Sequence, residues 1–231
     1  RCSRSSLENN RACRKVFPMI AAQIKTFSAE LPKQVTLVAV SKTKPNADLI
    51  VAYEAGQRDF GENKVQELCE KAASLPNDIR WHMIGHLQRN KVKYIAPFVH
   101  LIHGVDSERL LIEVNKQGAK NNRVIDVLIQ IHIAEEATKF GFSYEEAAKL
   151  FAGNNDLKHV NIVGLMAMAS FTEDESQIKR EFSTLSEFFD QWKEKSSLDV
   201  LSMGMSNDYP LAIAEGSTMI RIGSLIFGSR N

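Results

Sequence analysis

The chain alternates short apolar runs with longer amphipathic runs, and this alternation most constrains its fold. The apolar runs predicted as strands cover residues 36–41, 59–61, 79–84, 101–105, 124–133, 162–169, 200–203 and 219–223. Amphipathic runs predicted as helices cover residues 18–30, 47–55, 64–73, 110–116, 144–151, 176–192 and 210–214. This order is typical of parallel βα units. Eight such strands in a chain of this length predict an α/β fold, a single (β/α)₈ TIM-type barrel with an extra N-terminal helix. A doubly wound parallel sheet with fewer strands is the alternative.

Length and composition favour one folded domain. The chain has 231 residues, of which 44% are hydrophobic and 25% charged, so it can bury one sizeable core. Residues 1–17 are basic, polar and without periodicity, and we expect them to form a disordered or artificial leader. The domain is therefore predicted to span residues 18–231.

Charge and cysteine content exclude several classes of protein. A formal net charge of +1 supplies no broad basic field, so neither nucleic acid nor a membrane is an expected partner. Three cysteines at irregular spacing support neither a disulfide framework nor a zinc site. With no apolar run of membrane-spanning length and no secretory signal, we expect a soluble cytoplasmic protein.

A lysine at the end of the first strand is the first candidate for chemistry. Alternation places Val38, Val40 and Lys42 on one face of this strand, which we expect to be buried. Burial disfavours an ammonium ion, and a neutral amine can attack a carbonyl group. The alternative is that Lys42 extends to water from the strand end and has no role.

The junctions after the seventh and eighth strands are suited to an anion. In a barrel of this type, phosphate groups are commonly held by these two loops. Gly223 allows close approach of the backbone, and Ser206 and Ser224 offer hydroxyl groups. Alternatively, Ser206 or Asn207 caps the following helix and Gly223 relieves crowding. Together with Lys42 on the adjacent first strand, these junctions predict a site for a phosphorylated aldehyde.

Two more polar residues lie at strand positions. Arg221, inside the eighth strand, either faces a ligand, where its charge would oppose protonation of a pyridine nitrogen, or pairs with a carboxylate such as Glu62. Asn63 either lies against a ligand beside Lys42 or caps the next helix. His82 and His86 surround a strand end, where their spacing does not align two metal ligands, so no metal site is expected.

Several sequence motifs resemble those of a known family, the pyridoxal phosphate homeostasis proteins. The resemblance covers residues 35–231, and its matching runs are residues 39–45, 60–63, 81–88 with Asn90 and Lys91, 164–167, 202–206 and 216–223. It implies the fold of the alanine racemase N-terminal barrel. It also implies that Lys42 forms an aldimine with pyridoxal 5′-phosphate, that Met205, Ser206, Gly223 and Ser224 hold its phosphate, and that Arg221 approaches the pyridine nitrogen. A role for Lys139, which matches a family position, stays open.

The resemblance favours a protein that binds the cofactor for vitamin B6 homeostasis without established catalysis. Partners would be pyridoxal phosphate and PLP-dependent apoenzymes, and we expect a monomer. Alanine racemases complete their site with a tyrosine from a second domain, which we do not expect here. A weak racemase-like enzyme and a phosphosugar enzyme with a Schiff-base lysine are the alternatives, and Lys44 is the rival to Lys42 as the anchor.

Overall fold

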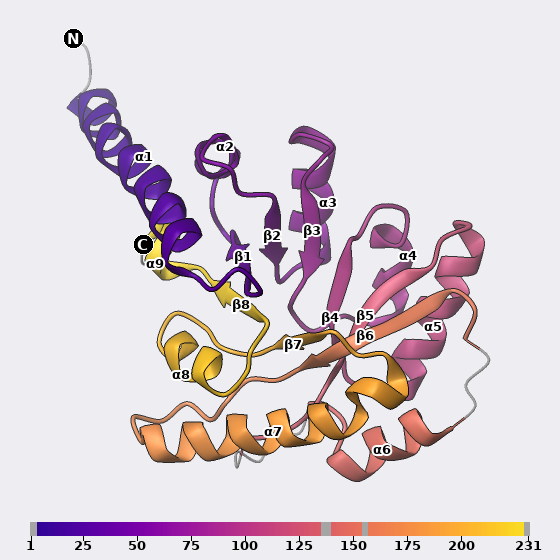
Figure 1. Cartoon of the computed structure of the whole chain (residues 1–231). Coiled ribbons are helices and arrows are strands. Elements are labelled where there is room, and N and C mark those ends of the chain that lie inside the picture. Colours follow the sequence, from indigo (N-terminus) through magenta and orange to yellow (C-terminus); the bar gives the residue numbers. More distant parts are fainter. Residues whose placement is uncertain (1–3, 135–139, 154–156, 229–231) are drawn as a thin grey trace.

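The computed structural model describes residues 4–134, 140–153 and 157–228, and it describes side chains from Phe17 onward. In chain order the elements are α1 (Arg4–Glu30), β1 (Thr36–Val40), α2 (Asn46–Glu54), β2 (Asp59–Glu62), α3 (Val65–Ser74), β3 (Arg80–Met83), η1 (Arg89–Lys91), α4 (Val92–Ile95), β4 (Leu101–Val105), α5 (Glu108–Lys120), β5 (Ile125–Gln130), α6 (Tyr144–Ala152), β6 (Val160–Met166), α7 (Glu175–Ser196), β7 (Val200–Ser202), α8 (Tyr209–Ala214), β8 (Met219–Ile222) and α9 (Ser224–Phe227) (Figure 1).

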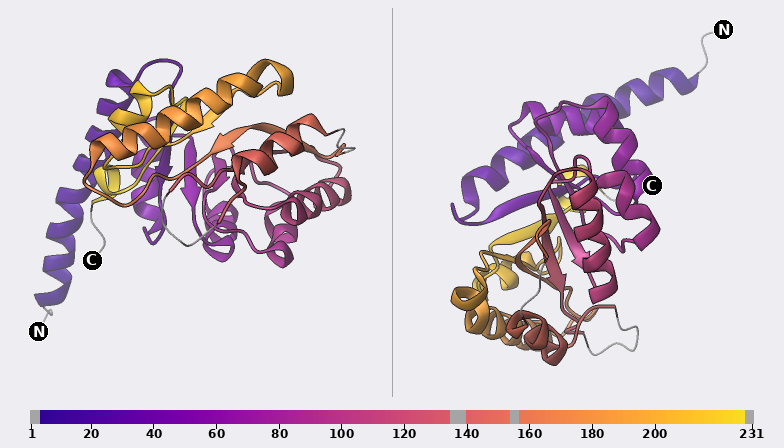
Figure 2. Two further views of the ribbon diagram at one scale, coloured as in Figure 1. Left: turned by 90° about the horizontal axis from the view of Figure 1, so that it is seen from below. Right: turned by 90° about the vertical axis from the view of Figure 1, so that its right-hand side faces the viewer.

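The eight strands form a closed parallel barrel in chain order, β1 to β8. The barrel closes where β8 pairs with β1, with Val38 opposite Arg221 and Ala39 opposite Ile222. The helices lie around the outside of the strands (Figure 2). The predicted (β/α)₈ barrel is therefore confirmed, and the doubly wound sheet is excluded.

Both faces of the strands are buried, as expected for a barrel covered by helices. Val38 belongs to a small apolar cluster with Leu101, Leu128, Met166 and Met219, which line the barrel interior. Leu37 and Ala39, which alternate with Val38 along β1, instead join the large core between barrel and helices. Alternation along the strand thus separates two cores, as period-two geometry requires.

Helix α1 is longer than the sequence predicts. It begins at Arg4 rather than at Pro18, and Pro18 lies inside it. Its carboxyl-terminal half buries Ile20, Ile24 and Phe27 in the core, while the other half extends away from the barrel (Figure 1). The predicted helix start at Pro18 is therefore wrong, and the division of the chain at residue 17 stays a prediction.

Other differences concern the ends of elements. The sequence gives no clear helix after the third strand, yet η1 and α4 lie there, and α9 follows β8 directly. Both α4 and α9 are only four residues long, too short to show a helical period. The predicted strands over residues 124–133 and 162–169 are too long, because pairing of β5 with β6 ends at Gln130 and Met166. The apolar residues beyond this pair enter loops.

None of the helices among the described residues has both the length and the apolar character needed to cross a bilayer.

Gly164 in β6 generates a test of the barrel wall. A Cβ atom at this position would overlap the backbone carbonyl group of Val200 in β7. Gly164→Ala should therefore lower the free energy of unfolding by about 2–3 kcal/mol, because the strands must move apart. Gly61→Ala is the control, since its added methyl group meets only side-chain carbons of Val38 and Ile84. Urea denaturation of both variants measures the difference, and equal losses would contradict it.

Candidate ligand-binding site at the carboxyl ends of the strands

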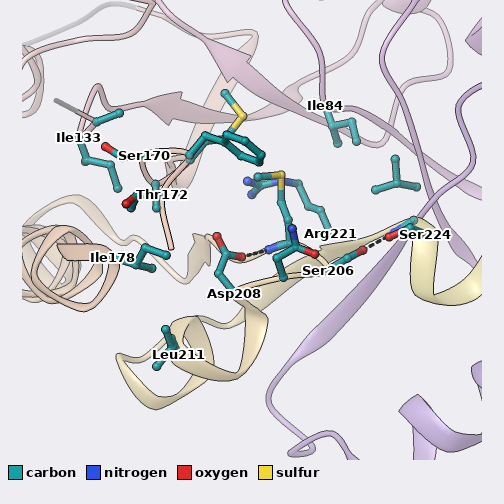
Figure 3. A pocket seen from close by; sticks show the side chains of 18 of the residues that line it. Ile84, Ile133, Ser170, Thr172, Ile178, Ser206, Asp208, Leu211, Arg221 and Ser224 are labelled. Atoms are coloured by element: carbon teal, nitrogen blue, oxygen red, sulfur yellow. Dashed lines mark hydrogen bonds between the residues drawn. The ribbon is translucent and has the colours of Figure 1, made fainter. Parts of the chain in front are cut away.

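A cavity of about 960 Å³ opens at the carboxyl ends of the barrel strands. This volume lies within the range of small-molecule sites. Every residue predicted from the sequence to bind the cofactor lines it: Lys42, Asn63, Met205, Ser206, Arg221, Gly223 and Ser224. Figure 3 shows Ser206, Arg221 and Ser224 around this cavity, with the apolar residues Ile84, Ile133 and Ile178. The structure thus brings together residues from seven βα junctions, those after β1, β2, β3, β5, β6, β7 and β8.

The turn that follows β1 places Lys42 at this cavity. Lys42 is half-buried, so the expectation of a fully buried lysine is only partly met. The next residue, Thr43, has a φ of 65°, a left-handed conformation that is strained for a β-branched residue. Such strain persists only where surrounding contacts hold the turn in place.

A buried ionic cluster on the outer side of the barrel holds this turn. Lys71 of α3 donates to the Ser41 carbonyl oxygen (2.8 Å), to Glu62 (2.7 Å) and to Glu67 (2.7 Å). Glu62 also accepts from the Ser41 hydroxyl group, and Glu67 accepts from the Thr43 backbone N–H (2.6 Å). These hydrogen bonds therefore hold Ser41 and Thr43, the neighbours of Lys42, from the outer side of the barrel.

Glu62 is the fully buried carboxylate of this cluster. One of its oxygens, Oε2, has no hydrogen-bond partner in the part of the chain that the structure describes. Burial raises the pKa of Glu62, and hydrogen bonds from Lys71 and Ser41 act in the opposite direction. Because Glu62 faces α3, the predicted alternative of a Glu62–Arg221 ion pair is wrong. The sequence signal for this pairing was Glu67 followed four residues later by Lys71, in the run predicted as a helix.

Lys44, the rival anchor, has a different position. Its Nζ donates to the carbonyl oxygens of Phe227 (2.9 Å) and Gly228 (3.3 Å), at the end of α9. It therefore fastens α9 to the β1 turn. Lys44 also lines the cavity, as Lys42 does.

Arg221 enters the cavity from the barrel interior. Its guanidinium group donates to the Ser202 carbonyl oxygen (2.8 Å), the Ser202 hydroxyl oxygen (2.6 Å) and the Ala167 carbonyl oxygen (2.9 Å). Burial lowers the pKa of Arg221 to about 10, and the charge of Asp208 partly offsets this. Arg221 therefore remains a cation at neutral pH. Within the part of the chain that the structure describes, these bonds use three of its five N–H groups.

The turns after β7 and β8 meet at the same end of the cavity. Gly204 has a φ of 95°, and a Cβ atom there would lie 2.6 Å from Cβ of Ala212, so only glycine lets β7 turn closely into α8. Asp208 accepts from the Met205 backbone N–H (2.5 Å), and the Ser206 hydroxyl group accepts from the Gly223 N–H (3.4 Å) (Figure 3). The N–H groups of Met205 and Gly223 thus have acceptors within these turns, and the second of these bonds joins the two turns through Ser206.

The capping alternatives receive a clear answer. The residue that precedes α8 is Asp208, not Ser206 or Asn207, and the residue that precedes α3 is Lys64, not Asn63. Both Ser206 and Asn63 face the cavity instead. The crowding alternative for Gly223 is correct, because a Cβ atom there would lie 3.2 Å from the carbonyl oxygen of Val40. Lys139 lies outside the described residues.

His82 and His86, the two histidines considered as metal ligands in the sequence analysis, lie in different environments. His82 is buried inside the barrel, whereas His86 is exposed and its Nδ1 lies 3.0 Å from a carboxylate oxygen of Asp106. They therefore share no site.

The family of this chain follows from comparison with known proteins. Residues 18–231 match the family model for the alanine racemase N-terminal domain. A solved alanine racemase from Clostridium difficile superposes with a TM-score of 0.73 at 13% identity, covering 94% of this chain and 57% of that one. At this identity the likeness establishes the fold alone, a racemase-type barrel.

Nearer relatives define the family within this class. A pyridoxal phosphate homeostasis protein from Aquifex aeolicus is 40% identical over 197 residues, which cover 84% of this chain and 86% of the relative. The structure of PipY from Synechococcus elongatus, solved with PLP bound, superposes with a TM-score of 0.82 at 35% identity, covering 90% of this chain and 100% of PipY. The chain belongs to the family of pyridoxal phosphate homeostasis proteins.

The ionic cluster behind Lys42 yields a prediction about stability. Lys71→Met leaves the Glu62 carboxylate buried without its cation, which should cost about 3–5 kcal/mol of unfolding free energy at pH 7. Loss of Lys71 should raise the folded-state pKa of Glu62 further above its unfolded value, so the variant gains more stability than the wild type as the pH falls. Urea denaturation at pH 7 and pH 5.5 should show the deficit shrinking at the lower pH.

Lys64→Met provides the matched control, because Lys64 is exposed and immediately precedes α3. It should change stability by less than about 0.5 kcal/mol at either pH. A Lys71→Met deficit that is independent of pH would contradict the assignment of Glu62 as the unpaired group.

Proposed function

We propose that this protein binds pyridoxal 5′-phosphate reversibly through Lys42 and serves its homeostasis without turning over a substrate. One observation carries the proposal: the side chains of Lys42 and Arg221 and the turns after β7 and β8 line a single cavity. The names of the curated relatives and the PLP-bound structure of PipY support it.

The donor set of the cavity fits the chemistry of this cofactor. Pyridoxal 5′-phosphate supplies an aldehyde that condenses with amines and a pyridine ring that can withdraw electrons. The Lys42 amine would hold the aldehyde end. The hydroxyl groups of Ser206 and Ser224 and the backbone at Met205 and Gly223 would hold the phosphate, since serine hydroxyls and backbone N–H groups are suitable phosphate donors.

Arg221 would face the pyridine nitrogen and limit how strongly the ring is activated. Its side chain lines the cavity, and the guanidinium group stays charged at neutral pH. A cation next to the pyridine nitrogen opposes protonation of that nitrogen, and an unprotonated ring withdraws electrons less strongly. This position of Arg221 is consistent with holding the cofactor rather than activating it.

The alternatives receive less support. The alanine racemase matches share only the fold with this chain, so a racemase-like activity is not favoured. A phosphosugar enzyme would be expected to have relatives of that kind, whereas the relatives at about 40% identity are named for homeostasis of pyridoxal phosphate.

The proposal extends to the setting in which the cofactor is used. We place the protein in the cytoplasm as a monomer that supplies the cofactor to PLP-dependent apoenzymes. Support comes from the cavity itself, which the described residues of one chain line from seven βα junctions. The cysteine content, which indicates no disulfide framework, fits a reducing compartment.

Lys42→Ala tests the anchor. The wild-type protein should develop an absorbance band with pyridoxal 5′-phosphate that borohydride reduction converts into a stable adduct, and Lys42→Ala should lose that adduct because the attacking amine is missing. Lys44→Ala should retain the adduct, since Lys44 binds the end of α9. Mass spectrometry after reduction identifies the modified residue. An adduct retained in Lys42→Ala and lost in Lys44→Ala would overturn the assignment.

Ser206→Ala tests the phosphate end. Loss of one hydrogen bond to a charged phosphate should weaken the affinity for pyridoxal 5′-phosphate by about tenfold. Affinity for pyridoxal, which has no phosphate, should stay unchanged and is the internal control. Equal effects on both ligands, measured by absorbance titration, would place the phosphate elsewhere.

A further inference from the structure

A continuous line of buried polar side chains crosses the barrel interior and ends at Arg221. Asp59, the first residue of β2, lies 3.0 Å from Nε2 of His82, and Nδ1 of His82 lies 2.9 Å from Nε2 of His103. Nδ1 of His103 lies 3.1 Å from the Ser202 hydroxyl group, which accepts from Arg221. All five side chains are buried. The line joins the amino-terminal end of the barrel to the ligand cavity.

The chemistry of the two ends fixes the direction of every hydrogen bond in this line. Arg221 can only donate, and an ionised Asp59 can only accept. Burial would raise the pKa of Asp59, but hydrogen bonds from His82 and Arg80 outweigh it and hold this pKa at about 2. Asp59 is therefore a carboxylate at neutral pH, and its acceptor role is secure.

Counting protons gives one arrangement for the links between these ends. The line has four links, and neutral His82, neutral His103, the Ser202 hydroxyl group and Arg221 supply one proton each. Both imidazoles then carry their proton on Nε2, and Ser202 donates to Nδ1 of His103. Burial lowers the pKa of His103 well below its usual value, which favours this neutral form. A fifth proton would leave one buried donor without an acceptor in the line.

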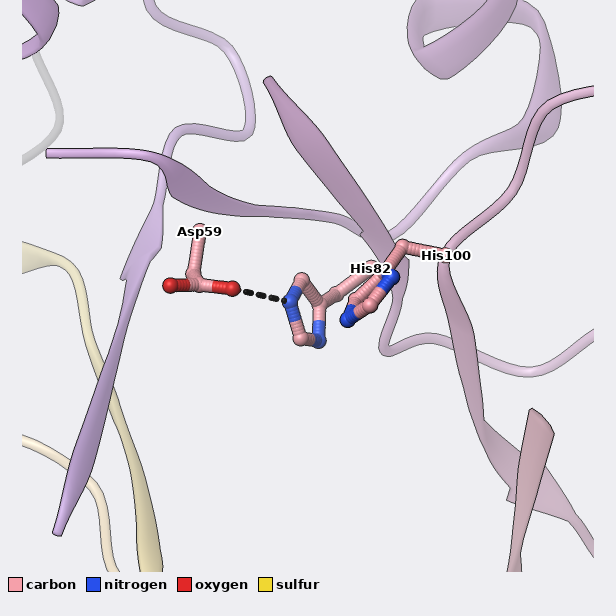
Figure 4. Close-up of side chains that lie close together, drawn as sticks. All are labelled: Asp59, His82 and His100. Atoms are coloured by element: carbon pink, nitrogen blue, oxygen red, sulfur yellow. Dashed lines mark hydrogen bonds and ion pairs between the residues drawn. The ribbon is translucent and has the colours of Figure 1, made fainter. Parts of the chain in front are cut away.

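A metal site is a weaker explanation of the polar side chains around Asp59, at the amino-terminal end of this line. Ligand atoms of Asp59, His82 and His100 all lie within 4.8 Å of one another (Figure 4). However, both oxygens of Asp59 already bind the guanidinium group of Arg80, with the Nε contact at 2.7 Å. A metal ion would have to displace this cation, and it would need Nε2 of His82 free of its proton. The hydrogen-bonded line is complete without such an ion.

We propose that Asp59, His82, His103 and Ser202 form a proton-ordered relay that positions the guanidinium group of Arg221 against the ring of the bound cofactor. The proposal rests on the proposed function, since it assigns a ligand contact to Arg221. Ser202 is the residue that acts directly on Arg221, and the other three act through it. Because each link has a defined donor, the relay orients Nη1 toward Ser202 and holds the guanidinium group at the cavity that Arg221 lines.

Nitrogen NMR of the cofactor-free protein tests the proton order by itself. In protein labelled with [¹⁵N]histidine, His82 and His103 should both show the neutral form with the proton on Nε2 at pH 7. A cationic imidazole, or a proton on Nδ1 in either residue, would overturn the relay. This measurement needs no cofactor, so it stands even if the proposed function fails.

Ser202→Ala tests the effect on the cavity. It removes the hydroxyl group and leaves Arg221 with its two backbone carbonyl partners. We expect the dissociation constant for pyridoxal 5′-phosphate to rise about tenfold, as for the loss of one hydrogen bond to a charged group, and the absorbance of the bound cofactor to shift. His103 should also show a mixture of tautomers. Ser202→Thr restores the hydroxyl group and should restore the affinity and the spectrum.

Ser217→Ala is the matched control. Ser217 is a buried serine whose hydroxyl group contacts only the backbone carbonyl oxygens of Leu201, Met203 and Met219. It should leave the affinity, the spectrum and the tautomers unchanged even if it lowers stability. If Ser202→Ala binds the cofactor with wild-type affinity and spectrum, the positioning role fails while the proposed function stands.

Asp59→Asn tests the far end without changing shape, and it covers the case in which Ser202→Ala does not fold. An amide can either accept from His82 or donate to it, so the order of the line is no longer imposed. The histidine signals should change from one tautomer to a mixture, and the absorbance of the bound cofactor should shift. Unchanged tautomers together with an unchanged spectrum would overturn the relay.

Discussion

Closure of the barrel between β8 and β1 is the constraint on which the site depends. Backbone pairing there sets Val38 beside Arg221, so the strand that leads to Lys42 and the strand that carries Arg221 are neighbours. The same closure brings Gly223 against Val40, where an added Cβ atom would lie 3.2 Å from the Val40 carbonyl oxygen. An open sheet with the same strand order would leave the first and last strands at opposite edges. Residues some 180 positions apart in the chain share one cavity because the sheet has no edges.

Buried charge supports the site from two directions. On the outer face of the barrel, Lys71 and two glutamates fix the strained turn around Lys42. In the interior, the line from Asp59 to Ser202 reaches Arg221. Buried ions are costly unless they are paired and hydrogen-bonded. These buried charges lie beside Lys42 and Arg221, the two residues that would contact the cofactor. Their cost in stability is therefore balanced by a more rigid site, because residues that support a binding residue hold it in one geometry.

Much of the fold and of the candidate site could be predicted from the sequence, for identifiable reasons. Strand β4 was predicted to the residue, because its apolar residues Leu101, Ile102 and Val105 lie between the polar residues His100 and Asp106. Strand β6 was displaced by apolar residues that continue into a loop and line the cavity. Helices α4 and α9 were missed because four residues show no period. Ser206 and Gly223 were predicted as phosphate-binding residues because their place after the last two strands is a known position for phosphate sites in barrels, and both line the cavity.

The amino-acid pattern alone determined the number and order of strands and which residues stand at their carboxyl ends, because both follow from local periodicity. Only the tertiary structure decided the partners of buried polar groups. It paired Glu62 with Lys71 rather than with Arg221, and it joined Asp59 to Arg221 through two histidines and a serine. Those contacts join different strands across the barrel, or a strand to a helix outside it. Their geometry depends on barrel closure and on which face each strand residue occupies, information that no local stretch of sequence contains.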